Sequence, residues 1–174
     1  MKELKNHTFL FDVDDTLIYT NLTNFLSYKR AIFEITGIIL SDKFLKDRCD
    51  KRVLQYLNLD KQACFEIARA KEKYFKEYIK QTSINKKLFK LMQSIQKESE
   101  VFIVTNAKES RINLMFEFYN LKNLPQIYIN KSGNKYQNCI EKYNLDAKKI
   151  IAFDDEISQL KNASKAGIIN IFKI

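Results

Sequence analysis

The stretch Thr8-Phe9-Leu10-Phe11-Asp12-Val13-Asp14-Asp15-Thr16-Leu17 is an apolar run that leads directly into a cluster of acids. The segment 8–13 is short and almost continuously apolar, which is typical of a strand buried on both faces of a parallel sheet. Residues two apart in a strand point to the same side, so we expect Asp12 and Asp14 to face one place at its carboxyl end. Open α/β sheets bind their ligands at that edge.

Four further segments have the same strand character, and segments with helical spacing lie between them. The predicted strands are residues 101–104, 126–129, 150–153 and 168–172. The helical segments carry apolar residues at Leu88, Leu91, Met92 and Ile95; at Ile112, Met115, Phe116 and Tyr119; at Tyr136, Cys139, Ile140 and Tyr143; and at Ile157, Leu160, Ala163 and Ala166. Gly167 suits the end of the last helix. This alternation predicts an α/β fold with a doubly wound parallel sheet.

The chain between the first two strands is far longer than one crossover needs, and residues 18–82 contain no stretch that reads as a strand. We therefore predict an α/β core of residues 1–17 and 83–174, with a small helical cap inserted at residues 18–82. A helix marked by Phe25, Tyr28, Ile32 and Ile35 should end at Gly37, Ser41 is a candidate N-cap for a second helix, and Asp60 for a third that carries Cys64, Ala68 and Phe75. The alternative, that these helices extend the main core, stays open.

The composition describes an ordinary globular protein. The chain has 174 residues, 45% of them hydrophobic, which suits one domain with a modest insertion. It has no pattern of a signal peptide and no run of eighteen apolar residues, so we expect no membrane association. Cys49, Cys64 and Cys139 form neither a CxxC pair nor a disulfide framework, which favours a reducing, cytoplasmic location. The sequence leaves the oligomeric state open.

The net charge of +9 raises the question of nucleic-acid binding. Lysines alternate with acids, as in Lys71-Glu72-Lys73, and no block of five basic residues occurs, which disfavours a dedicated nucleic-acid surface. A basic protein attracts anions, so the charge favours a small phosphorylated substrate.

A second acidic pair, Asp154-Asp155, follows the strand at 150–153 just as Asp12 and Asp14 follow the first strand. One such acid would be an ordinary turn or N-cap residue. Four at two strand ends indicate a cation, because clustered carboxylates repel one another, and such hard oxygen ligands suit Mg²⁺. We therefore predict a magnesium site from Asp12, Asp14, Asp154 and Asp155.

Two weaker signals concern phosphate. Thr105 and Asn106 end the strand at 101–104 and precede a helix, so their hydroxyl and N–H groups are candidates to bind phosphate, although capping is an ordinary role there. Lys135 is the first residue of the helix that contains Tyr136 and is a candidate to bind phosphate. Lys131 in the preceding loop is the alternative candidate for this role.

Together these residues resemble the haloacid dehalogenase-like (HAD) hydrolase superfamily over essentially the whole chain. The DxDxT motif is matched by Asp12-Val13-Asp14-Asp15-Thr16, the strand that ends in Thr by Thr105, the helix-start lysine by Lys135, and the acidic pair by Asp154-Asp155. The resemblance implies a Rossmann-like HAD core with a helical cap. There are departures: Phe153 stands where Gly is frequent, Ser158 where some members have an acid, and Lys135 lacks the following Pro.

The resemblance also implies a mechanism, in which Asp12 attacks phosphorus to give an aspartyl phosphate while Asp14 protonates the leaving oxygen and later activates water. Magnesium would be held by the Asp12 and Asp154 carboxylates and the Asp14 carbonyl, and Asp155 would orient a water on the metal. Thr105, Asn106 and Lys135 would bind the phosphoryl oxygens. Halide needs no protonation, so Asp14 favours a phosphohydrolase over a dehalogenase.

Other chemistries have little support. The single histidine, His7, precedes the first strand, and the three glycines form neither a dinucleotide-binding nor a P-loop motif. The alternatives that stay open are a phosphotransferase or phosphomutase with the same intermediate, a nucleic-acid end phosphatase, and a non-catalytic binding protein with this fold.

Overall fold

A computed structural model of the chain describes residues 6–43 and 53–174, and the chain divides into two compact units. One unit consists of Met1–Ile18 together with Ile84–Ile174, and the other of Tyr19–Ser83. A helix capped by Ser41 would run into residues 44–52, which lie outside the described residues. Ser41 Oγ accepts a hydrogen bond from the N–H of Lys43 at 3.4 Å.

The first unit is built on a five-stranded sheet in the order β5-β4-β1-β6-β7, in which every neighbouring pair is parallel. The strands are β1 (Thr8–Phe11), β4 (Glu100–Thr105), β5 (Gln126–Ile129), β6 (Ile150–Asp154) and β7 (Asn170–Lys173). Phe11 at the end of the central strand pairs with Ile103 on one side and Phe153 on the other. The residues that follow these three strands therefore meet at one edge of the sheet.

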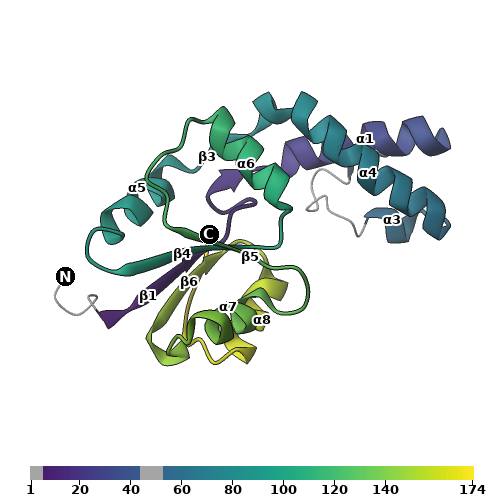
Figure 1. The fold of residues 1–174 in the computed structure, drawn as a ribbon. Helices are drawn as coiled ribbons and strands as arrows, with labels where there is room; N and C mark the ends of the chain where they lie inside the picture. Colours follow the sequence, from purple (N-terminus) through teal and green to yellow (C-terminus); the bar gives the residue numbers. More distant parts are fainter. Residues whose placement is uncertain (1–5, 44–52) are drawn as a thin grey trace. The chain divides into compact units, whose positions relative to one another are not determined.

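Helices cover both faces of this sheet (Figure 1). The helices α5 (Lys86–Ile95) and α6 (Glu109–Phe118) lie on one face, and α7 (Lys135–Tyr143) and α8 (Ile157–Lys165) on the other. A 3₁₀ turn, η3 (Ala147–Lys149), leads into β6. One core cluster joins Leu10, Phe102 and Ala152 of the sheet to Cys139 of α7 and Ala163 of α8. The predicted doubly wound α/β fold is confirmed.

Two details of the prediction are wrong. Residues 18–82 do contain a strand, because β2 (Ile18–Tyr19) pairs with β3 (Ser83–Ile84), and a two-residue strand is too short to show periodicity. Leu91, which its helical spacing placed on a core face, is 45% exposed. The buried face of α5 is formed by Leu88, Phe89 and Met92.

The second unit is helical. Its elements are α1 (Asn21–Thr36), α3 (Val53–Tyr56), α4 (Lys61–Glu77) and the 3₁₀ turn η2 (Ile79–Gln81). As predicted, α1 ends at Gly37, whose φ of 71° suits glycine and whose N–H bonds to the carbonyl of Phe33 at 2.8 Å. Asp60 caps α4 by accepting from the N–H of Ala63 at 2.7 Å, also as predicted.

The helices α1 and α4 bury their own cluster of apolar residues, to which α3 contributes. The cluster contains Phe25, Tyr28, Ala31, Ile32, Leu40, Val53, Leu54, Ile67 and Tyr74. No helix among the described residues has the length and apolar character needed to span a bilayer.

Candidate active site

The loop after β1 turns tightly, which fixes where its acids lie. The N–H of Asp12 still bonds to the carbonyl of Phe153 in β6 at 3.0 Å, so Asp12 continues the sheet. Three residues later Asp15 has a left-handed φ of 61°, a conformation that Asp tolerates better than most residues. Its N–H bonds to the carbonyl of Ile18 at 2.7 Å and closes the loop. Asp12 and Asp14 are thereby held at the sheet edge.

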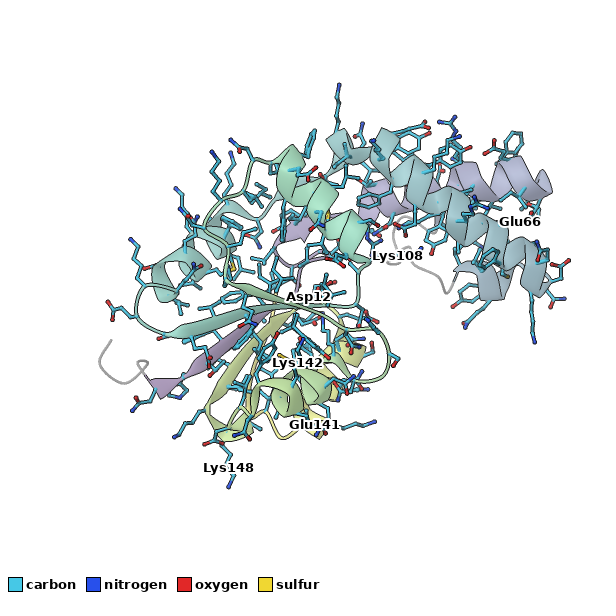
Figure 2. The ribbon with its side chains drawn as sticks, viewed as in Figure 1. Asp12, Glu66, Lys108, Glu141, Lys142 and Lys148 are labelled. Atoms are coloured by element: carbon cyan, nitrogen blue, oxygen red, sulfur yellow. The ribbon has the colours of Figure 1, made fainter. Side chains whose placement is uncertain are left out.

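Three carboxylates meet at this edge. Asp12, Asp154 and Asp155 each offer an oxygen, and these atoms lie within 4.8 Å of one another. Asp12 is 5% and Asp154 1% exposed. Figure 2 shows Asp12 at the end of β1 inside the sheet unit, whereas Glu141 and Lys148 lie at its periphery. The hydroxyl of Thr16 donates to Asp155 Oδ1 at 3.2 Å and ties the two acidic loops together.

Lys135 supplies the positive charge in this cluster. Its ammonium group donates to Asp12 Oδ1 and lies 2.8 Å from Asp154 Oδ2, and its side chain is only 1% exposed. Its backbone position is set by Asn134, whose side chain caps α7. Lys131, the rival residue in the sequence, is exposed. Of the two lysines, Lys135 is the one that contacts the carboxylates.

Burial dominates the electrostatics of the cluster. It raises the pKa of the Asp12 carboxyl, which Lys135 opposes and Asp154 reinforces. Burial also acts against the charged form of Lys135, but Asp12 and Asp154 outweigh it and raise the pKa of its ammonium group. When all three carboxyl groups are ionised, they and the ammonium group carry two net negative charges, so the ionised cluster is short of positive charge.

This donor set fits a divalent cation such as Mg²⁺. The three carboxylates are hard oxygen ligands that converge within 4.8 Å, and a cation of charge two would balance the two net negative charges. Asp12, Asp154 and Asp155 are the residues that would hold it. The carboxylate of Asp14 is not part of this group of converging oxygens, and the atom of Asp14 that the family resemblance assigns to the metal is its backbone carbonyl.

Asp14 instead pairs with an arginine. Arg111 Nη2 lies 3.2 Å from Asp14 Oδ2, and the two side chains are 14% and 13% exposed. Arg111 belongs to α6, the helix that follows Thr105. Arg111 was not predicted from the sequence, because a single arginine in an amphipathic helix carries no signal of its role.

The two residues after β4 differ in their surroundings. Thr105 is 1% exposed and its hydroxyl accepts from the N–H of Ala107 at 3.0 Å. Asn106 is exposed, and its Oδ1 accepts from Asn130 Nδ2 at 2.9 Å. Asn130 therefore joins the loop after β4 to the loop that leads to Lys135.

Asn130 is itself held in place. It is 6% exposed, its Nδ2 also donates to the carbonyl of Gly133 at 3.2 Å, and its Oδ1 accepts from Asn138 Nδ2 at 2.8 Å. Asn138 Nδ2 also donates to the carbonyl of Ser132 at 2.8 Å. This network was not predicted from the sequence, because asparagines in a loop are ordinary turn residues.

Comparison with known proteins gives the family. A family model of the haloacid dehalogenase-like hydrolases matches residues 9–172. Among curated proteins, none matches the sequence.

Solved structures share the fold. A haloacid dehalogenase-like family hydrolase from Streptococcus pneumoniae is 15% identical, with a TM-score of 0.79 over 95% of this chain and 83% of its own. A predicted phosphatase from Clostridium acetobutylicum is 16% identical, with a TM-score of 0.78 over 97% and 94%. A predicted phosphoglycolate phosphatase from Haemophilus somnus is 14% identical, with a TM-score of 0.77 over 97% and 85%. The resemblance in the sequence is confirmed: the chain belongs to the haloacid dehalogenase-like hydrolase family.

Proposed function

We propose that this hydrolase is a magnesium-dependent phosphatase that cleaves a small phosphate monoester through an aspartyl phosphate on Asp12. The observation that carries the proposal is the contact of Asp12 with Lys135 beside the carboxylates of Asp154 and Asp155. A phosphate dianion needs positive charge around a carboxylate nucleophile, and this cluster has an ammonium group and three carboxylates that would hold a cation. The names of two structural neighbours, both predicted phosphatases, agree with phosphate as the group transferred.

In the first step, an oxygen of Asp12 attacks phosphorus and the bond from phosphorus to the ester oxygen breaks. Asp14 gives a proton to that oxygen, so an alcohol leaves. In the second step, water attacks phosphorus, the bond to Asp12 breaks, and Asp14 takes the proton. The sum is a monoester plus water giving an alcohol plus phosphate.

The other residues bind and orient. Lys135 would neutralise phosphoryl oxygens, and Thr105 and Asn106 would bind them through hydroxyl and N–H groups. Magnesium held by Asp12, Asp154 and Asp155 would supply positive charge that offsets the repulsion between Asp12 and the phosphate.

The direct experiment measures phosphate release from p-nitrophenyl phosphate by the parent, Asp12→Asn and Asp146→Asn, each with Mg²⁺ and with EDTA. Asp146 is an exposed aspartate that caps η3, so it is a matched control. We expect the kcat of Asp12→Asn to be lower than that of the parent by about a thousandfold or more. EDTA should abolish phosphate release by the parent. Equal activity of the parent and Asp12→Asn would reject the nucleophile. A rapid quench with ³²P-labelled substrate should trap label on the parent and on Asp146→Asn, but not on Asp12→Asn.

We also propose that residues 18–82 act as a cap that selects the leaving group. The helical unit has a hollow of about 220 Å³, lined by Leu26, Lys29, Arg30, Phe33, Ile39 and Tyr78. Phe33→Ala and Ile39→Ala, at positions 55% and 76% exposed, should change the relative kcat/KM values for sugar phosphates, nucleoside monophosphates and phosphoglycolate. Inhibition by inorganic phosphate should not change. An unaltered substrate ranking in both variants would count against this role.

A further inference from the structure

Tyr136 contacts the buried acid Asp154 through its hydroxyl. The phenol donates to Asp154 Oδ2 at 2.7 Å, and the residue is fully buried. Lys135 Nζ lies 2.8 Å from the same oxygen, and the other oxygen, Oδ1, accepts from the N–H of Glu156 at 2.9 Å. Both oxygens of Asp154 are thus held, one of them by two consecutive residues of α7.

The position of Tyr136 is fixed from two sides. Its backbone N–H donates to Asn134 Oδ1 at 3.0 Å, so the N-cap of α7 fixes the position of the Tyr136 backbone. Its ring belongs to the core cluster that includes Leu10, Phe102 and Cys139. A phenol anchored by both a cap and a core has little freedom, so its hydroxyl is held in a defined direction toward Asp154.

A hydroxyl differs from an ammonium group in what it does to a cation site. Lys135 orients Asp154 but also places a positive charge beside it, which opposes a second cation. The Tyr136 hydroxyl can orient the same oxygen without changing the net charge of the cluster. Donors of this kind behind a ligating carboxylate set its orientation and commonly affect metal affinity strongly.

We propose that Tyr136 is a positioning residue of the metal centre, whose hydroxyl holds the Asp154 carboxylate in the orientation that binds Mg²⁺. The inference rests on the proposed function, because that proposal assigns Asp154 to the metal. It assigns to Tyr136 a task beyond filling the core. From the sequence alone, Tyr136 was predicted only as an apolar residue on the core face of a helix.

The competing explanation is that the hydroxyl only satisfies a buried oxygen. Removing it would then lower the stability of the protein and leave metal affinity unchanged. Stability and metal affinity must therefore be measured on the same variants.

The test compares Tyr136→Phe with Tyr143→Phe. Tyr143 lies in the same helix, and its hydroxyl accepts from Gln126 Nε2 at 3.0 Å instead of contacting an acid, so it is a matched control. Metal-free protein is titrated with Mg²⁺ by isothermal titration calorimetry, and folding is followed by circular dichroism. We expect Tyr136→Phe to bind Mg²⁺ about ten- to a hundredfold more weakly, and Tyr143→Phe to bind like the parent.

The outcomes separate this inference from the proposed function. If the parent binds no Mg²⁺, the proposed metal site is wrong and the inference falls with it. If the parent and a folded Tyr136→Phe bind Mg²⁺ equally, the inference is overturned while the proposed function stands.

A second measurement covers the case in which Tyr136→Phe does not fold. The chain has nine tyrosines and no tryptophan, so its near-ultraviolet difference spectrum reports tyrosines. Saturation of the parent and of Tyr143→Phe with Mg²⁺ should perturb tyrosine absorbance in the same way, because the ion alters the carboxylate that the Tyr136 hydroxyl contacts. Binding of Mg²⁺ without any such perturbation would overturn the inference.

Discussion

The ammonium group of Lys135 donates a hydrogen bond to the carboxylate of Asp12, although 123 residues separate the two in the chain. The central strand β1 delivers Asp12 to the sheet edge, and the N-cap at Asn134 starts α7 so that its first residue reaches the same place. Both side chains are buried, so removal of either one would leave the other as a buried charge without this partner.

Replacement of Lys135 by Met should therefore damage both stability and activity. It leaves Asp12 and Asp154 buried without a cation, which should lower the free energy of unfolding by about 3–5 kcal/mol in the absence of metal. Lys135→Arg should retain part of that stability. Urea denaturation and kcat for p-nitrophenyl phosphate measure the two effects. Lys131→Met is the matched control, and a larger loss of activity in it than in Lys135→Met would reverse the choice between the two lysines.

Arg111 should matter through Asp14, whose carboxylate it contacts. If Arg111 orients a catalytic acid, Arg111→Met should reduce kcat about a hundredfold for an alkyl phosphate, whose leaving oxygen needs a proton. The reduction should be much smaller for p-nitrophenyl phosphate, which has a good leaving group. Arg111→Lys should restore part of the alkyl activity, and the exposed Arg69→Met serves as control. An equal reduction for both esters would refute an orienting role.

Asn130 joins the loop after β4 to the loop that leads to Lys135. Asn130→Ala removes the partners of Asn106, Gly133 and Asn138, so the free energy of unfolding should fall by about 1–3 kcal/mol. Binding of phosphate should weaken as well, by about tenfold, which corresponds to roughly 1.4 kcal/mol. The inhibition constant of inorganic phosphate measures this. Exposed Asn113→Ala should change neither quantity, and unchanged inhibition in Asn130→Ala would show that the two loops bind phosphate independently.

Cys139 should be inert to thiol reagents in the folded protein. Burial raises the pKa of its thiol to about 12, so the reactive thiolate is scarce at any pH well below that value. With Cys49 and Cys64 replaced by Ser, Ellman's reagent at about pH 8 should modify Cys139 only after guanidinium unfolds the chain, and native reactivity should grow as the pH rises. Rapid release of one equivalent of thionitrobenzoate from the native variant would contradict the burial of Cys139.

The sequence predicted the main elements because their signals are local. The apolar run before Asp12 and the similar runs at 101–104 and 150–153 identified strands that the structure contains, and Gly37 and Asp60 marked helix ends correctly. The two-residue strands β2 and β3 were missed, since their pairing depends on segments far apart in the chain. The exposure of Leu91 was missed as well, since helical spacing alone does not show which apolar side chains of a helix face solvent.

By itself, the sequence determined the class of fold, the family and the order of the acidic motifs, because hydrophobic periodicity and residue type are properties of short segments. Only the tertiary structure decided which partners each acid has. Asp154 meets Tyr136, Asp14 meets Arg111, and Lys135 rather than Lys131 meets Asp12. These contacts join residues on different elements of the sheet unit, and their distances follow from strand register, helix caps and core packing acting together, which no local pattern encodes.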